Sequence, residues 1–188
     1  MTRRDKTAMR NRILEAADQL FYGRGIRSTG VDEIAAEAEV SKRTLYNHFA
    51  SKDDLVVAYL QRRLRPIRAS GQPPVDQILG LFSQLEHTFR SPAFRGCPFV
   101  NALAEVGGPN HRAATVAIEF KEQRRLWFRD LLAETGARDP GALATQLMLL
   151  VDGAIVTALV RKDPTVAHAA RNAAAALLAA AGVREKDQ

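Results

Sequence analysis

Apolar residues return every three or four positions along most of this chain, which confines it to helical folds. In residues 6–22 this spacing places one apolar side on an α-helix. The same spacing recurs in residues 75–89, 98–106, 110–134, 142–160 and 164–182. No segment shows the strict alternation of apolar and polar residues that is typical of strands, and no internal repeat is present. We therefore predict an all-α chain.

Capping signals divide the first 60 residues into four helices. Gly23 and Gly25 end the first helix, and Thr29, with Asp32 three residues later, is predicted to cap the second, which ends near Glu39. Ser41 is the predicted cap of a third helix over 42–49, and Ser51, followed by Asp54, that of a fourth. The short turn between the second and third helices is typical of a helix-turn-helix unit, whose last helix enters the major groove of DNA.

The third helix has an inward and an outward side. Leu45 and Phe49 lie four residues apart and are predicted to face the core. The remaining side chains can contact bases or phosphates, and they are Lys42, Arg43, Thr44, Tyr46, Asn47 and His48. Residues 41–52 contain no acid, and residues 1–65 hold 13 Lys and Arg against 9 Asp and Glu, so four of the six net positive charges lie there. Charge alone is equally consistent with a merely solvated basic face.

Pro66 and residues 70–74 form the strongest internal break. We expect a DNA-binding domain over 1–50, with its motif reaching about residue 58, and a helical domain over 51–188. The single cysteine, Cys97, rules out an intramolecular disulfide and suits the cytoplasm, as does the lack of an apolar leader at the N-terminus. Residues 142–160 are long enough to cross a membrane. Asp152 near their centre makes a buried helix of a soluble protein the favoured interpretation.

An enzyme is disfavoured. The sequence contains no His-Glu-x-x-His, no glycine-rich phosphate loop and no Gly-x-Ser-x-Gly, and its four histidines are scattered. We therefore expect no catalytic residues, no metal site and no cofactor.

Three runs of residues resemble one known family. They are Thr29-Gly30-Val31-Asp32-Glu33-Ile34-Ala35, Val40-Ser41-Lys42-Arg43-Thr44-Leu45-Tyr46-Asn47-His48-Phe49 and Ser51-Lys52-Asp53-Asp54-Leu55. Together they resemble the DNA-binding domain of the TetR family of transcriptional regulators over roughly residues 9–58. Residues 96–101 are also similar to a segment of one of its subgroups. Glu39 departs from the family pattern, which commonly has Gly at this turn.

The resemblance implies a homodimeric repressor that binds a palindromic DNA operator and is released by a small-molecule effector. By position it makes Lys42, Arg43, Thr44 and Asn47 the residues that face bases. Tyr46, His48 and Lys52 become phosphate contacts, and Thr29 a cap that also touches phosphate. An architectural DNA-binding protein with no ligand remains an alternative. Small residues throughout 154–182 allow close helix approach, so we expect the last two helices to form the dimer interface.

The effector pocket is less constrained by the sequence. Candidate lining residues are Phe82, Phe89, Phe99, Asn101, Glu105, Phe120, Trp127, Met148 and Asp152. Asp152 is either an anion in the pocket or a group that ties helices together, and the second role is favoured. In that role its expected partner is an arginine or a backbone donor. Cys97 precedes Pro98 and could be an N-cap thiol with redox sensitivity, although a small buried apolar residue is the simpler interpretation.

Overall fold

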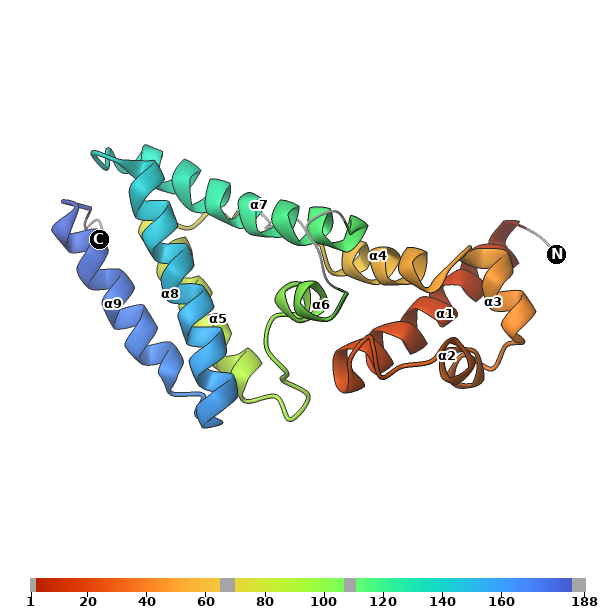
Figure 1. Ribbon diagram of the computed structural model, residues 1–188. Helices are drawn as coiled ribbons and strands as arrows, with labels where there is room; N and C mark the ends of the chain where they lie inside the picture. The colour runs from red at the N-terminus through yellow and green to blue at the C-terminus, as the bar shows by residue number, and fades with distance from the viewer. Residues whose placement is uncertain (1–2, 65–69, 107–110, 184–188) are drawn as a thin grey trace. The chain divides into compact units, whose positions relative to one another are not determined.

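The computed structural model describes residues 3–64, 70–106 and 111–183, which form nine α-helices and no strand (Figure 1). The helices are α1 (Arg3–Arg24), α2 (Val31–Glu37), α3 (Lys42–His48), α4 (Lys52–Arg63), α5 (Pro74–Phe89), α6 (Pro98–Val106), α7 (Arg112–Glu134), α8 (Pro140–Arg161) and α9 (Val166–Ala180). The all-α prediction is confirmed. The predicted helices occur at their expected places, with ends that shift by a few residues.

The chain divides into two compact units. The first contains residues 1–65 and 97–120, so it takes in α1 to α4, α6 and the beginning of α7. The second contains residues 66–96 and 121–188, with α5, the rest of α7, α8 and α9. The expected domain of residues 1–50 lies within the first unit, which also includes helices from much later in the sequence.

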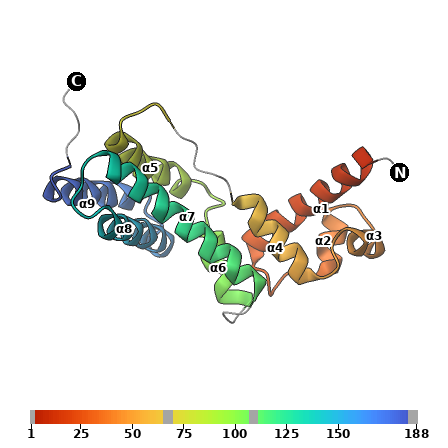
Figure 2. The same cartoon turned by 90° about the horizontal axis from the view of Figure 1, so that it is seen from above.

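In the first unit, α1 packs against both α2 and α4 (Figure 2). Ile13 and Ala17 on α1, Ile34 on α2 and Leu55 on α4 are all buried. At the far end of this contact Arg63 donates two hydrogen bonds, of 2.6 and 2.7 Å, to the carboxylate of Asp18. This bidentate pair fixes the direction of α4 relative to α1.

The turn between α2 and α3 has a left-handed residue at its centre. Glu39 has φ of 51°. Its N–H donates to the carbonyl of Ala36, and the next N–H, of Val40, donates to the carbonyl of Ala35. These two bonds form the Schellman motif that closes a helix C-terminus. The carbonyl of Glu39 in turn accepts a 3.1 Å hydrogen bond from Arg12 on α1, so the turn is held from both sides.

Helix α6 is bound to the turn that joins α1 and α2. The carboxylate of Glu105 accepts a 2.9 Å hydrogen bond from the backbone N–H of Arg27, and the Arg27 guanidinium donates to the Glu105 carbonyl. A Cβ atom on Gly25 would lie 2.9 Å from the Glu105 carboxylate, and Gly25 has φ of 98°. The positive φ favours glycine here, and a Cβ atom would also displace this carboxylate from its present position.

The second unit is a helical bundle in which α5, α8 and α9 pack side by side (Figures 1 and 2). Phe82, Phe128, Leu132 and Leu147 are fully buried in its core. Both α8 and α9 bury alanines in this bundle, namely Ala154, Ala158, Ala167, Ala170 and Ala174. Their small side chains let the two helix backbones approach closely. Part of the alanine-rich sequence therefore serves packing within one chain.

Helix α8 is long and apolar enough to cross a membrane by length and composition. Its buried residues recur every three or four positions and join the core of the second unit, from Leu143 through Leu147 and Val151 to Ala158. A helix that presents one side to a protein core matches the interpretation favoured from the sequence.

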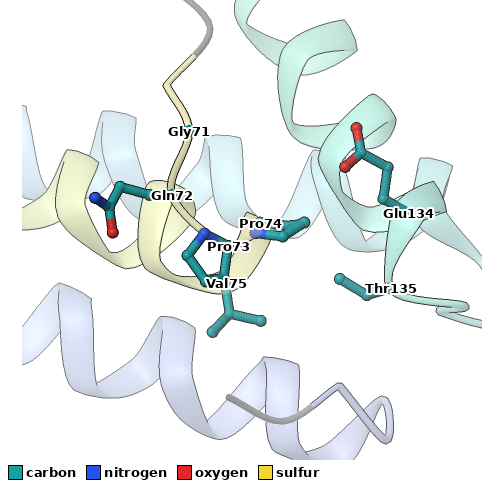
Figure 3. Close-up of a pocket in the computed structure, with 7 residues that line it drawn as sticks. All are labelled: Gly71, Gln72, Pro73, Pro74, Val75, Glu134 and Thr135. Atoms are coloured by element: carbon teal, nitrogen blue, oxygen red, sulfur yellow. The ribbon is translucent and has the colours of Figure 1, made fainter. Parts of the chain in front are cut away.

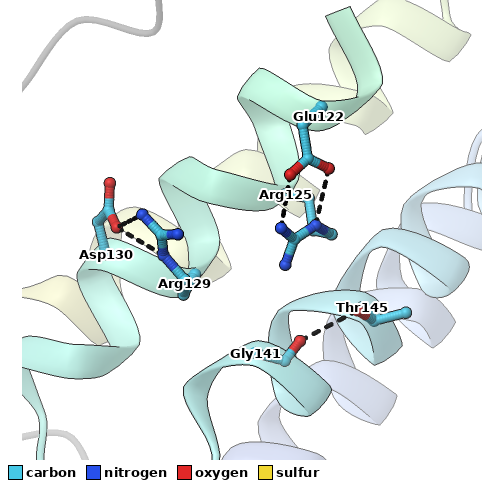
Figure 4. Close-up of polar contacts among 6 residues, drawn as sticks. All are labelled: Glu122, Arg125, Arg129, Asp130, Gly141 and Thr145. Carbon is cyan, nitrogen blue, oxygen red and sulfur yellow. Dashed lines mark hydrogen bonds and ion pairs between the residues drawn. The ribbon is translucent and has the colours of Figure 1, made fainter. Parts of the chain in front are cut away.

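Local polar pairs cover the exposed sides of α7 and α8 (Figure 4). Arg125 donates from Nε to Glu122 over 2.8 Å, and Arg129 pairs with its neighbour Asp130. The bond from Arg125 lowers the pKa of Glu122. On α8 the Thr145 hydroxyl donates to the carbonyl of Gly141. These contacts join residues of one helix, so they add little to the packing between helices.

We predict that Glu39→Gly stabilises the protein. A residue with a Cβ atom in the left-handed region costs about 1 kcal/mol relative to glycine, so the free energy of unfolding in urea is expected to rise by about that amount. Glu37→Gly is the matched control. Glu37 is the last residue of α2, and glycine at a helical position is expected to lower the free energy of unfolding by about 0.5–1 kcal/mol. A destabilisation of the same size in both variants would contradict the strain at Glu39.

Candidate nucleic-acid interface

Helix α3 is anchored by its inward side chains. The hydroxyl of Ser41 caps the helix by accepting a 3.0 Å hydrogen bond from the N–H of Thr44. Leu45 is fully buried and Phe49 nearly so, which confirms the inward side predicted from the sequence. The guanidinium of Arg10 on α1 lies 4.8 Å from the centre of the Phe49 ring and covers its outer side.

The outward side of α3 carries the predicted contact residues. Lys42, Arg43, Tyr46 and Asn47 are exposed, whereas Thr44 and His48 are half-buried. Tyr46 has 42% of its surface exposed, so its ring does not serve mainly to fill the core. The Thr44 hydroxyl lies 2.8 Å from that of Ser41, so it is shared with the cap. The exposed groups include two cations, a phenol and an amide, which suit phosphate and base contacts.

An acidic residue of α2 reaches this side. The Nζ atom of Lys42 lies 3.0 Å from one carboxylate oxygen of Asp32 and 3.1 Å from the other. The hydrogen bond and the charge of this carboxylate raise the pKa of the Lys42 ammonium. Residues 41–52 lack acids in the sequence, yet an acid from the preceding helix contacts their first lysine. No sequence pattern points to this pair, because it depends on the angle between α2 and α3.

Thr29 does not have its predicted place. The N-cap of α2 is Gly30, whose N–H donates 2.8 Å to the carboxylate of Glu33. The Thr29 side chain is buried and its hydroxyl donates to the carbonyl of Gly25 over 2.7 Å. The predicted cap is therefore wrong. The hydroxyl instead closes the turn between α1 and α2 by giving the Gly25 carbonyl a hydrogen-bond partner.

Helix α4 begins beside α3 as predicted. The hydroxyl of Ser51 accepts from the N–H of Asp54 over 3.0 Å and donates to the Asp54 carboxylate. Lys52, the predicted phosphate contact, is the first residue of this helix and is half-buried. Asp54 also accepts from Arg112 at the start of α7, and this bond is the main reason that the pKa of Asp54 is lowered.

The predicted effector residues of the first unit are Phe99, Asn101, Glu105 and Phe120. The rings of Phe99 and Phe120 are stacked, with centroids 3.9 Å apart and planes within 10°. Glu105 is occupied by the backbone of Arg27. Cys97 is buried, and its carbonyl accepts the first hydrogen bond of α6, from Asn101. Burial agrees with the simpler interpretation of this thiol.

The predicted effector residues of the second unit are Phe82, Phe89, Trp127, Met148 and Asp152. Phe82, Phe89 and Met148 belong to the core, and Trp127 packs against it. Asp152 accepts a hydrogen bond from Lys121 and so ties α8 to α7. The partner is a lysine where an arginine or backbone donor was expected. The predicted residues are thus divided between two units, and their role in ligand binding stays a prediction.

Two pockets lie in other places. One, of about 420 Å³, is lined by Gly71, Gln72, Pro73, Pro74, Val75, Glu134 and Thr135, at the beginning of α5 and the end of α7 (Figure 3). The other, of about 490 Å³, lies between α1 and α4 and is lined by Arg10, Asn11, Leu14, Glu15, Ala58, Gln61 and Arg62. Neither contains a predicted effector residue. In the described part of the chain no group of three His, Cys, Asp or Glu residues could hold a metal ion.

Two family models match the sequence. Residues 13–59 match the model of bacterial regulatory proteins of the tetR family, and residues 108–182 match a tetracyclin repressor-like C-terminal domain. The first match spans the whole helix-turn-helix region described above, including α3 and the turn at Glu39.

Solved structures resemble nearly the whole chain. A TetR transcriptional regulator from Streptomyces avermitilis is 34% identical, with a TM-score of 0.84 over 94% of this chain and 99% of that one. A TetR-family transcriptional regulator from Streptomyces coelicolor is also 34% identical, with a TM-score of 0.86 over 93% of this chain and 96% of that one.

Curated relatives match over stretches of differing length. The HTH-type transcriptional repressor DhaR of a Mycobacterium species is 27% identical over 173 residues, which cover 84% of this chain and 86% of that protein. The activator FasR of Mycolicibacterium smegmatis is 49% identical over 55 residues, which cover 29% of this chain and 25% of that protein. In FasR and three further curated relatives, the matched stretch spans only 25% to 44% of the relative's own length.

Proposed function

Because this chain belongs to the TetR family of DNA-binding transcriptional regulators, we propose that it is a homodimeric repressor of a palindromic operator, released by a small molecule. The observation that carries the proposal is the outward side of α3. Its exposed Lys42, Arg43, Tyr46 and Asn47 stand on a helix that is anchored through Leu45 and Phe49. Such a helix can enter a major groove without disturbing the core.

Each outward residue has a matching partner on DNA. Arg43 can donate two hydrogen bonds to a guanine, and Asn47 can pair with an adenine. Thr44 and Lys42 lie beside them at the start of the helix. Tyr46 and His48 would contact phosphates together with Lys52 of the next helix, which sets the position of α3 along the duplex. Because the hydroxyl of Thr29 is buried, its proposed phosphate contact would be made by its backbone.

The dimer is proposed to form through α8 and α9. Leu149, Val156 and Val160 are 69%, 57% and 76% exposed. Spacings of seven and four residues place them in one row on α8. On α9 the exposed row consists of Ala169, Asn172, Ala176, Ala179 and Ala180, so it is apolar apart from Asn172. A second copy of the chain would cover both rows and form a four-helix interface.

The effector proposal rests on the family and on the apolar character of the second unit. Ligand binding would be seen as a rise in melting temperature in a thermal-shift screen of small molecules. The same compound must also lower operator affinity, because the two sites are linked. A compound that stabilises the protein and leaves DNA binding unchanged would favour the alternative, a DNA-binding protein that no ligand releases.

We predict that Arg43→Ala weakens operator binding by about 1–3 kcal/mol, as expected for the loss of a bidentate base contact. Gel shifts with DNA from upstream of the protein's own gene, with random DNA as competitor, measure the change. Lys52→Ala is the matched comparison. It is expected to weaken specific and random binding alike and to reduce the salt dependence by about one unit per protomer. If Arg43→Ala weakens binding to operator and to random DNA equally, Arg43 contacts a phosphate and not a base.

We predict that Val156→Glu prevents dimerisation, because each copy would bury a carboxylate against an apolar surface. Sedimentation should then show a monomer, and operator binding should fall at least tenfold. Ala133→Glu adds the same charge at an exposed position of α7 and is expected to leave the dimer intact. A Val156→Glu protein that stays dimeric would move the interface elsewhere.

A further inference from the structure

The ion pair between Asp32 and Lys42 lies beside the exposed residues of α3, and Asp32 is also one of two acids in the first turn of α2, where a negative charge favours the helix. Both side chains are exposed, Lys42 by 54% and Asp32 by 74%. An ion pair of this kind contributes only about 0–1 kcal/mol to stability. The neighbouring Glu33 already closes the first turn of α2 by accepting from Gly30, and it pairs with Arg24. The fold therefore gains little from Asp32, whose charge in the first turn of α2 adds only about 0.3–1 kcal/mol.

An acid at this place affects DNA binding in two ways. It neutralises one of the cations that would otherwise attract phosphates, which lowers the affinity for DNA of any sequence. It also presents carboxylate oxygens, which accept hydrogen bonds and cannot donate them. In the major groove a carboxylate finds donors in the amino groups of cytosine and adenine, whereas it is repelled by the N7 and O6 acceptors of guanine.

The ion pair places an acceptor and a donor side by side. The ammonium of Lys42 lies within 3.1 Å of both Asp32 oxygens, so the two charged groups form one compact unit. A C·G base pair offers the matching arrangement, since the cytosine amino group and the guanine carbonyl oxygen adjoin each other in the major groove. Asp32 would accept from cytosine and Lys42 would donate to guanine. With the base pair reversed, the Asp32 carboxylate would face the guanine carbonyl oxygen, another acceptor, and the Lys42 ammonium would face the cytosine amino group, another donor.

We propose that Asp32 is a specificity-determining residue, which holds Lys42 away from phosphates and selects a C·G pair at one position of each operator half-site. The inference rests on the proposed function, because it requires α3 to lie in the major groove. It adds a residue of α2 to the reading surface and explains why an acid lies on a side that otherwise attracts DNA.

Asp32→Asn tests the proposal. Asparagine has the shape of aspartate without its charge, and it can both donate and accept, so it no longer distinguishes cytosine from guanine. Affinity for random DNA should rise several-fold, and its salt dependence should increase by about one unit per protomer as Lys42 turns to a phosphate. Binding selection from a randomised library should lose its preference at one symmetry-related pair of positions, where discrimination falls about tenfold or more.

Glu37→Gln is the matched control. Glu37 is an exposed acid at the other end of α2, and its replacement removes the same charge. It should change operator and random binding equally, with every sequence preference kept. Both variants should remain folded, with melting temperatures that differ from the wild-type value by only a few degrees. A general rise in affinity for Asp32→Asn, with unchanged preferences, would overturn the proposal and leave Asp32 as a simple repulsive charge.

The wild-type protein separates this inference from the proposed function. If it selects no palindromic site from the library, the proposed function fails and the role of Asp32 fails with it. If it selects a palindromic site, and the Asp32→Asn variant selects the same site with the same preferences, the proposed function stands and only the inference about Asp32 is refuted.

Discussion

The left-handed turn at Glu39 is the constraint on which the exposed side of α3 depends. It closes α2 with two backbone hydrogen bonds and sends the chain into α3 at a fixed angle. Arg12 holds the same turn from α1. Because this angle is fixed, Leu45 enters the core while Arg43, Tyr46 and Asn47 stay outside. A different turn would place other side chains outward, even with the same helix sequence.

The same angle brings Asp32 against Lys42, so α2 does more than support α3. The outward side of α3 carries the cations Lys42 and Arg43, but their charges are not independent of the acids on α2. A lysine held by a carboxylate contributes less to general attraction than a free one. Affinity for any DNA and preference for one sequence can thus be set by different residues of the two helices.

Three polar residues that the sequence proposed as ligands or contacts are used within the fold. Thr29 closes the turn between α1 and α2, Glu105 binds the backbone of Arg27, and Asp152 joins α8 to α7 through Lys121. The common reason is that polar groups among apolar residues need hydrogen-bond partners. Thr29 finds its partner within the same turn, whereas Glu105 and Asp152 find theirs in distant segments of the chain. A sequence pattern identifies such a residue as unusual without identifying its partner.

The sequence by itself determined the all-α class, the order of the helices, the caps at Ser41 and Ser51 and the inward side of α3. Each of these depends on residues within one turn or two of each other, where spacing and capping chemistry act directly. Only the tertiary structure decided that α6 joins the first unit and that Asp32 meets Lys42. These features depend on the angles at which helices pack, and such angles result from many contacts between segments that are distant in the sequence.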